Sequence, residues 1–252
     1  MEVHHHCHTS RKKWTHYFWE FFMLFLAVTA GFLVENQREH YVEHQREKQY
    51  MKSMIEDLKS DTSQISTVIQ LKVLRNNMID SLVFWLSSPG YRAHLNDIYF
   101  FARSVSPPLN FFPNDRTIQQ LKSSGGLRLI RSINVSNSIM EYDQKMKFQL
   151  SDIGDEENLR LEYRKSVRKL FDGKIFMVML ENIDRIEKPI NNPPLFNDDK
   201  TEINNLLVDI QYVKKACQIQ ITRHLELRKQ AIALIELIQK EYHLSEGTPL
   251  AK

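Results

Sequence analysis

The chain has 252 residues, a formal net charge of +3 at pH 7 and 26% charged residues. So small a net charge, without a basic stripe of interleaved aromatic residues, argues against nucleic acid as a partner. Only 7 glycines accompany long runs of helical periodicity, so the composition predicts an all-α protein with solvated faces rather than a disordered chain.

Residues 1–13 are predicted to form a short, polar, histidine-rich tail. Imidazole and thiolate groups are the usual ligands of soft divalent metals. A flexible tail without supporting groups around its ligands would hold such an ion weakly, so we favour no metal here. The tail is either incidental or the remnant of a purification tag. Its weak candidate ligands are His4, His5, His6, Cys7 and His8.

Residues 14–34 have the length and hydrophobicity of a transmembrane helix. Between Phe21 and Val34 only Thr29 is polar, and about 20 residues of this kind cross the ~30 Å hydrocarbon core of a bilayer. Basic residues precede the segment and aromatic residues open it, as is typical of a membrane interface. These flanking residues are Arg11, Lys12, Lys13, Trp14, Tyr17 and Trp19.

Two alternatives compete with a permanent membrane helix. A core helix of a soluble protein would be hydrophobic on all sides and would need later helices to cover it. A signal peptide would be cut before Gly31, but the apolar run continues through Val34 and passes directly into a helical pattern, so cleavage would leave a hydrophobic stub. We therefore favour an uncleaved, single-pass anchor.

The positive charges favour a cytoplasmic N-terminus. Three basic residues directly precede the span, whereas Arg38, Arg46 and Lys48 after it are spread out, and a long domain translocates largely regardless of its charge. The predicted location is the inner membrane, with the helical domain in the periplasm. Cys7 and Cys217 would then lie on opposite sides, so no disulfide between them is expected.

Three residues within the span are candidates for a function. Glu20 is an acid inside an apolar segment, which marks either a relay or pairing group or a side chain that reaches back to the interface. Ala27 and Gly31, four residues apart, form a small-residue step that allows a second helix to approach closely.

Residues 35–244 are predicted to form an elongated helical bundle that continues from the span. A long helix should run to Ser87, followed by a short helix over 92–103 and a proline-rich loop over 106–115. Asn114 or Asp115 should cap a short helix that ends near Ser123. Another long helix should run from about 135 to 171, with a kink at Gly154 and its end at Gly173.

The last helix is predicted over 201–242, followed by a flexible tail over 245–252. Its apolar residues alternate at three- and four-residue steps, which favours coiled-coil packing against another long helix. The predicted buried stripe comprises Ile203, Leu207, Ile210, Cys217, Ile221, Leu225, Ile232, Ile235, Ile238 and Tyr242.

One short motif has zinc-peptidase spacing. His40, Glu43 and His44 match the H-x-x-E-H pattern, in which two histidines share a helix face and the glutamate acts as a base. Charges of alternating sign surround the motif, as on a solvated helix, and no third ligand is evident. We favour neither a metal nor catalysis here, and no cofactor is predicted.

A glycine pair gives the clearest conformational signal after the span. Gly125 and Gly126 should end a helix by adopting positive backbone angles. The alternative is an anion-binding nest formed by Ser123, Ser124, the two glycine amides and Arg128.

Several segments of the chain together match the pattern of a known family. These are Glu20, Gly31, 36–39, 56–58, 120–130, Ile139 and Tyr142. With these residues the chain resembles an uncharacterised family of single-span membrane proteins from Bacteroidota, with a helical domain of unknown function. The likeness covers most of the chain, although Glu35-Asn36-Gln37-Arg38 replaces the usual Asn-Asn-Trp-Asn exit from the span. It implies a topology and a fold and no activity.

These features lead to a functional hypothesis without catalysis. The chain is expected to be a membrane-anchored scaffold of the bacterial envelope, acting through contacts with other envelope proteins or with itself. The alternative is a sensor whose bundle binds a small molecule and shifts the membrane helix. A remote alternative is the zinc peptidase. A closed pocket with convergent polar groups would favour the sensor, and an exposed apolar strip would favour the scaffold.

Overall fold

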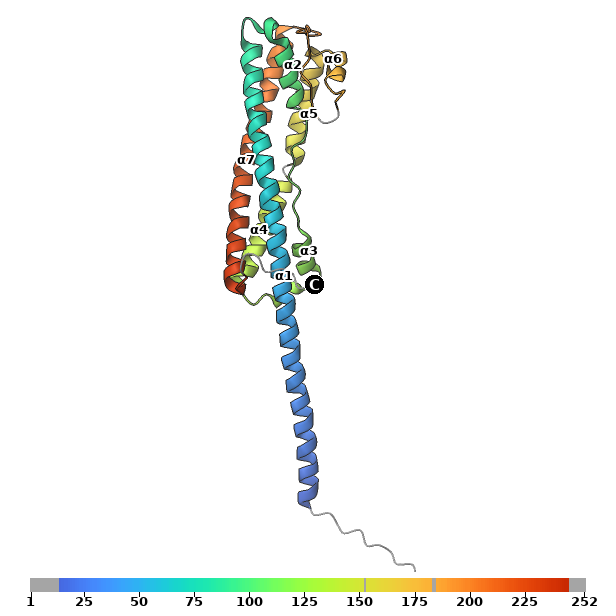
Figure 1. Ribbon diagram of the computed structural model, residues 1–252, viewed down its shortest axis with the longest axis vertical. Coiled ribbons are helices and arrows are strands. Elements are labelled where there is room, and N and C mark those ends of the chain that lie inside the picture. The colour runs from blue at the N-terminus through green and yellow to red at the C-terminus, as the bar shows by residue number, and fades with distance from the viewer. Residues whose placement is uncertain (1–13, 152, 183–184, 245–252) are drawn as a thin grey trace, which may run out of the picture. The chain divides into compact units, whose positions relative to one another are not determined.

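The computed structural model describes residues 14–151, 153–182 and 185–244, and every regular element in these residues is a helix (Figure 1). The predicted all-α class is therefore confirmed. The elements are α1 (Trp14–Ser87), η1 (Tyr91–His94), α2 (Leu95–Ser104), α3 (Arg116–Ser123), η2 (Gly126–Leu129), α4 (Ile133–Ser151), α5 (Ile153–Leu170), α6 (Gly173–Val178) and α7 (Lys200–Tyr242).

The chain divides into two compact units, residues 1–49 and 50–252. In the first unit, the described residues form the N-terminal part of α1, and its 14–34 segment is long and apolar enough to cross a membrane. All residues of this 14–34 segment are exposed except the half-buried Thr29. The core helix of a soluble protein would be buried, so this exposure argues against that alternative.

The second unit contains two hydrophobic cores that follow each other along the helices. One joins Met51–Val68 of α1 to α3, α4 and the C-terminal half of α7. The other joins Ile79–Leu86 of α1 to α2, α5 and the N-terminal half of α7. Both α4 and α5 pack against α7, which runs back beside the later part of α1 (Figure 1).

The buried face of α7 alternates by three and four residues, but it differs from the predicted stripe. Leu225 and Ile232 were predicted to be buried and are 49% and 37% exposed. The prediction was wrong there because it followed mainly large apolar residues, whereas the buried face also includes alanine and polar residues. The buried residues are Leu206, Ile210, Val213, Cys217, Gln220, His224, Leu227, Ala231, Leu234, Ile238 and Tyr242.

Helix α3 is capped by a distant residue and not by its neighbours. Asp115 holds the N-cap position, but its side chain makes no capping hydrogen bond. Asp57 of α1 instead accepts hydrogen bonds from the Thr117 amide at 3.0 Å and its hydroxyl at 2.6 Å. The predicted side-chain cap was therefore wrong, because a buried carboxylate from α1 supplies the acceptor that an exposed terminus needs.

The region after α5 also differs from the prediction. Gly173 does not end the long helix: α5 ends at Leu170, and Gly173 is the first residue of α6. The Asp172 side chain caps α6 by accepting from the Lys174 amide at 2.7 Å. Residue 152 between α4 and α5 lies outside the described residues, so the kink expected at Gly154 stays a prediction.

Candidate ligand-binding site

The site is organised around the start of the loop that follows α2. Proline at 107 and 108 removes backbone donors, so the loop cannot satisfy its own carbonyl groups by helical bonding. Arginine side chains supply the donors: Arg164 donates to the Ser106 carbonyl at 2.8 Å and to its hydroxyl at 2.9 Å. Arg160 donates to the same carbonyl at 3.2 Å, and Arg75 donates to the Pro107 carbonyl.

Behind this loop lies a buried ionic cluster. Glu156 of α5 accepts from Lys72 at 3.0 Å and from Arg75 at 3.2 Å, both on α1. All three side chains are at most 3% exposed. Burial lowers the pKa of Lys72, because the charged ammonium loses its hydration, while the Glu156 carboxylate opposes the shift. The cluster joins α1 to α5 between the two hydrophobic cores.

Helix α7 contributes Cys217 and His224 to the same polar layer. The Cys217 thiol lies 3.5 Å from the Lys72 carbonyl, and burial raises its pKa. A raised pKa disfavours the thiolate, which is the nucleophilic form, so Cys217 is suited to packing and not to covalent catalysis. His224 Nδ1 lies 2.8 Å from the Gln220 carbonyl, and its Nε2 is buried without a hydrogen-bond partner.

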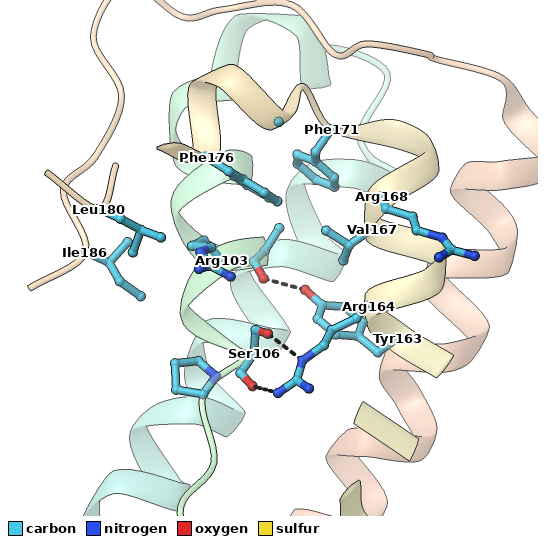
Figure 2. Close-up of a pocket in the computed structure, with 13 residues that line it drawn as sticks. Arg103, Ser106, Tyr163, Arg164, Val167, Arg168, Phe171, Phe176, Leu180 and Ile186 are labelled. Atoms are coloured by element: carbon cyan, nitrogen blue, oxygen red, sulfur yellow. Dashed lines mark hydrogen bonds between the residues drawn. The ribbon is translucent and has the colours of Figure 1, made fainter. Parts of the chain in front are cut away.

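A cavity of about 610 Å³ adjoins the same loop and is lined mainly by residues of α2, α5 and α6. Figure 2 shows Ser106 hydrogen-bonded to Arg164 on one wall and the rings of Phe171 and Phe176 on another. Its volume lies within the roughly 300–1,000 Å³ range of small-molecule pockets. The lining residues are Ala102, Arg103, Ser106, Pro107, Tyr163, Arg164, Val167, Arg168, Phe171, Gly173, Phe176, Leu180 and Ile186.

The charged groups that line this cavity, among the described residues, are all cationic. Three arginines line it, and none of the described lining residues is Asp or Glu. The Tyr163 hydroxyl already donates to the Ala102 carbonyl at 2.7 Å, and burial raises its pKa. The cavity therefore offers cationic donors and apolar walls but no group suited to act as a general base near neutral pH.

A second cavity, of about 540 Å³, lies beside the first. The two share Pro107, Leu180 and Ile186 as lining residues. The second is also lined by Arg75 and by apolar residues of α1. Arg75 thus connects three features: the buried ionic cluster, the loop carbonyl and the second cavity.

The candidate residues of the span lie on an exposed helix. Glu20 pairs with His16 one turn earlier, with 3.0 Å between Oε1 and Nε2. Ala27 and Gly31 are exposed, and a Cβ atom added at Gly31 would meet nothing within 4 Å. Their roles in helix packing and in the membrane stay predictions.

The H-x-x-E-H residues pair with acidic side chains one turn away on α1, and one of these acids, Glu47, is buried. His40 Nδ1 lies 3.9 Å from Glu43, whereas His44 Nδ1 lies 3.1 Å from Glu47. Within the described part of the chain, no group of three or more His, Cys, Asp or Glu residues is placed to hold a metal ion. The remaining candidate ligands, His4, His5, His6, Cys7 and His8, lie outside the described residues.

Gly125 follows the end of α3 in the predicted left-handed conformation, whereas Gly126 has no positive φ and is the first residue of η2. Gly125 has a φ of +67°, the left-handed conformation that favours glycine. The hydroxyls of Ser123 and Ser124 donate to the Gln120 carbonyl at 3.3 and 2.7 Å. These bonds complete the helix terminus, and Arg128 is exposed. The anion-binding nest stays a prediction.

The cavity residues were not predicted. Arg164 and Arg168 are one helical turn apart and share a face of α5, a spacing that is readable in the sequence. That Arg103 lines the same cavity is not readable from the sequence, because it depends on how α2 packs against α5.

Comparisons with family models, with curated proteins and with solved structures found no match to this chain.

Proposed function

We propose that this chain is a single-pass membrane protein of the bacterial envelope whose helical bundle binds a small molecule without transforming it. This proposal rests on the cavity of about 610 Å³ between α2, α5 and α6, which has arginine side chains on apolar walls. Large apolar pockets with a few directed polar groups are typical of ligand sites. The lining residues include no nucleophile paired with a base, which supports binding and not catalysis.

The membrane part of the proposal has separate support. The exposed apolar segment 14–34 has the length of a span, and the basic residues before it favour a cytoplasmic N-terminus with the bundle in the periplasm. The inner membrane is the corresponding location.

Binding has a physical route to α1. The loop carbonyls at 106 and 107 are held by Arg164, which lines the cavity, and by Arg75, which belongs to α1. A ligand that binds Arg164 competes with the Ser106 carbonyl for its guanidinium, so it changes how the loop is held. The Pro107 carbonyl, and Arg75 which donates to it, then move with the loop. If the ligand binds one arrangement of this loop more tightly than another, its binding shifts the position of α1, which continues to the 14–34 segment.

The experiment uses the full chain in phosphatidylcholine nanodiscs and equilibrium dialysis of three labelled ten-carbon probes: decanoate, decanol and decyltrimethylammonium. At least one should bind above the level of empty nanodiscs. Gly173→Leu should abolish this binding, because Gly173 lines the cavity and a Cβ added there meets nothing within 4 Å. The proposal is contradicted if no probe binds, or if Gly173→Leu leaves binding unchanged.

A second candidate function is self-association, which a row of exposed apolar residues on α7 favours. Val208, Tyr212 and Ile219 are 44%, 60% and 41% exposed and share one face at four- and seven-residue spacing. The proposed occupant is the α7 of a second copy, because an antiparallel copy presents the same row and buries it in a symmetric, coiled-coil-like contact. Tyr212→Glu with Ile219→Glu should convert a crosslinked dimer into monomer in nanodiscs. An unchanged dimer fraction, or a wild-type monomer, would exclude this candidate.

A further inference from the structure

We infer that the ligand of the α2–α5–α6 cavity is an amphiphilic anion, whose carboxylate or phosphate group pairs with Arg103 while its apolar chain covers Phe176, Leu180 and Ile186. This inference rests on the proposed function, because it names the chemical class that the cavity binds.

The first step is the charge balance of the cavity. Arg164 is compensated, since its guanidinium lies 3.0 Å from the Glu157 carboxylate and also donates to Ser106. Among the described residues, no carboxylate pairs with Arg103 or Arg168. None of the described residues that line the cavity is acidic either, so Arg103 and Arg168 have no counter-charge within the described part of the chain. A guanidinium presents a fork of donors that matches a carboxylate or a phosphate.

The second step concerns the state of Arg103. Its guanidinium lies over the Phe176 ring, 5.6 Å from the centroid, and this contact fixes its plane. Its Nε is buried and has no hydrogen-bond partner. In Figure 2 the side chain lies between Leu180 and Ile186 on one side and Ser106 on the other. A buried donor without an acceptor is costly, and an anionic oxygen beside this guanidinium would compensate for that cost.

The third step is the apolar wall. Phe171 and Phe176 stack with their centroids 5.4 Å apart, and Leu180 is 44% exposed although it lines the cavity. An inorganic anion would leave this surface in contact with water. An anion with an aliphatic chain removes apolar area from water at roughly 25 cal/mol per Å². The combination of uncompensated cations and apolar walls therefore selects an amphiphile over either a free ion or a neutral hydrocarbon.

The test uses the same dialysis in nanodiscs, with decyl phosphate and inorganic phosphate added to the three probes. Decanoate and decyl phosphate should bind at least about tenfold more tightly than decanol, since a charge-assisted hydrogen bond is worth roughly 1.5–3 kcal/mol. Decyltrimethylammonium should bind more weakly than decanol, and inorganic phosphate should not bind.

The variants locate the anionic group. Arg103→Gln should weaken decanoate binding by about tenfold and leave decanol unchanged. Arg168→Gln removes a positive charge that lines the cavity but points away from Arg103 (Figure 2), so it should weaken decanoate binding by a smaller factor. Lys165→Gln is the matched control, because it removes a positive charge from α5 at an exposed residue outside the cavity; it should change binding less than twofold.

The outcomes separate this inference from the proposed function. If decanol and decanoate bind equally and both arginine variants behave as wild type, while Gly173→Leu blocks both probes, the cavity binds ligands but the anionic class is wrong. If inorganic phosphate binds as tightly as decyl phosphate, the need for an apolar chain is wrong. If no probe binds, the proposed function fails as well. Arg103→Lys serves where Arg103→Gln does not fold, and it should retain part of the preference for the anion.

Discussion

At the scale of single residues, Glu156 is the only carboxylate that contacts the buried Lys72 and Arg75 in the described part of the chain. Glu156→Gln should therefore lower the free energy of unfolding by about 3–5 kcal/mol, because it leaves two buried cations without a counter-charge. Urea unfolding of the full chain, followed by circular dichroism, measures this change. Glu162→Gln is the matched control, since Glu162 pairs only with the exposed Lys165, and it should cause little change. Equal effects of the two substitutions would contradict the role of Glu156.

His224 should make the stability sensitive to mild acid. Burial lowers the pKa of His224 below its ordinary value of 6.5, and Lys72 adds to this shift while Glu156 and the Gln220 carbonyl oppose it. The folded state therefore binds fewer protons than the unfolded state between the folded pKa and 6.5. The free energy of unfolding should be highest above pH 6.5 and fall as the pH decreases through that window.

The measurement is the free energy of unfolding at pH 7.5 and at pH 5.5, for wild type and His224→Leu. In His224→Leu, the free energy of unfolding should fall less between pH 7.5 and pH 5.5 than it does in wild type. Burial raises the pKa of Asp61, so this residue affects the pH dependence of the free energy of unfolding with the opposite sign, at lower pH. Because wild type and His224→Leu both contain Asp61, its effect cancels when the two proteins are compared. His40→Gln, on the exposed surface of α1, should keep the wild-type pH dependence. The same pH dependence in wild type and His224→Leu would show that His224 is not responsible.

At the scale of elements, the two sides of α7 should respond differently to truncation. Leu227 is fully buried and Leu225 is 49% exposed, although the periodicity of large aliphatic residues predicted the reverse. Leu227→Ala should lower the free energy of unfolding by about 2–5 kcal/mol, because it opens a cavity in the core. Leu225→Ala should cost less than about 1 kcal/mol, since half of this side chain is already in water. A larger loss for Leu225→Ala than for Leu227→Ala would indicate that the predicted stripe is buried and the face described above is not.

Some features of these helices could be predicted from the sequence and others could not. The ends of α1 and α2 follow from Ser87-Ser88-Pro89-Gly90 and from the proline-rich loop, which act locally. The cap of α3 was missed because its acceptor, Asp57, is 60 residues away from Thr117. The buried face of α7 was missed at Gln220 and His224, because polar residues become buried only where another helix supplies partners or enough cover.

At the scale of the whole molecule, the candidate site was the least predictable part. Its arginines come from α2 and α5, and nothing in the separation of Arg103 from Arg164 indicates that both adjoin Ser106. The buried ionic cluster was also unpredicted, since Lys72 and Glu156 resemble ordinary surface charges in the sequence. The 14–34 segment was predictable, because its hydrophobicity is a property of consecutive residues and depends on no tertiary contact.

That segment gives the prediction on which the location of the molecule depends. The exposed side chains of 14–34 would make the chain insoluble without lipid, so wild type should stay in the membrane pellet after extraction with alkaline carbonate. Leu24→Asp with Leu26→Lys puts two charges near the middle of the segment, each costing roughly 2.5–3.5 kcal/mol on insertion scales. This double variant should move largely into the soluble fraction, whereas Tyr41→Lys, beyond residues 14–34, should remain in the pellet. Wild type that is released by carbonate, or a double variant that is retained as well as wild type, would show that 14–34 is not a membrane anchor.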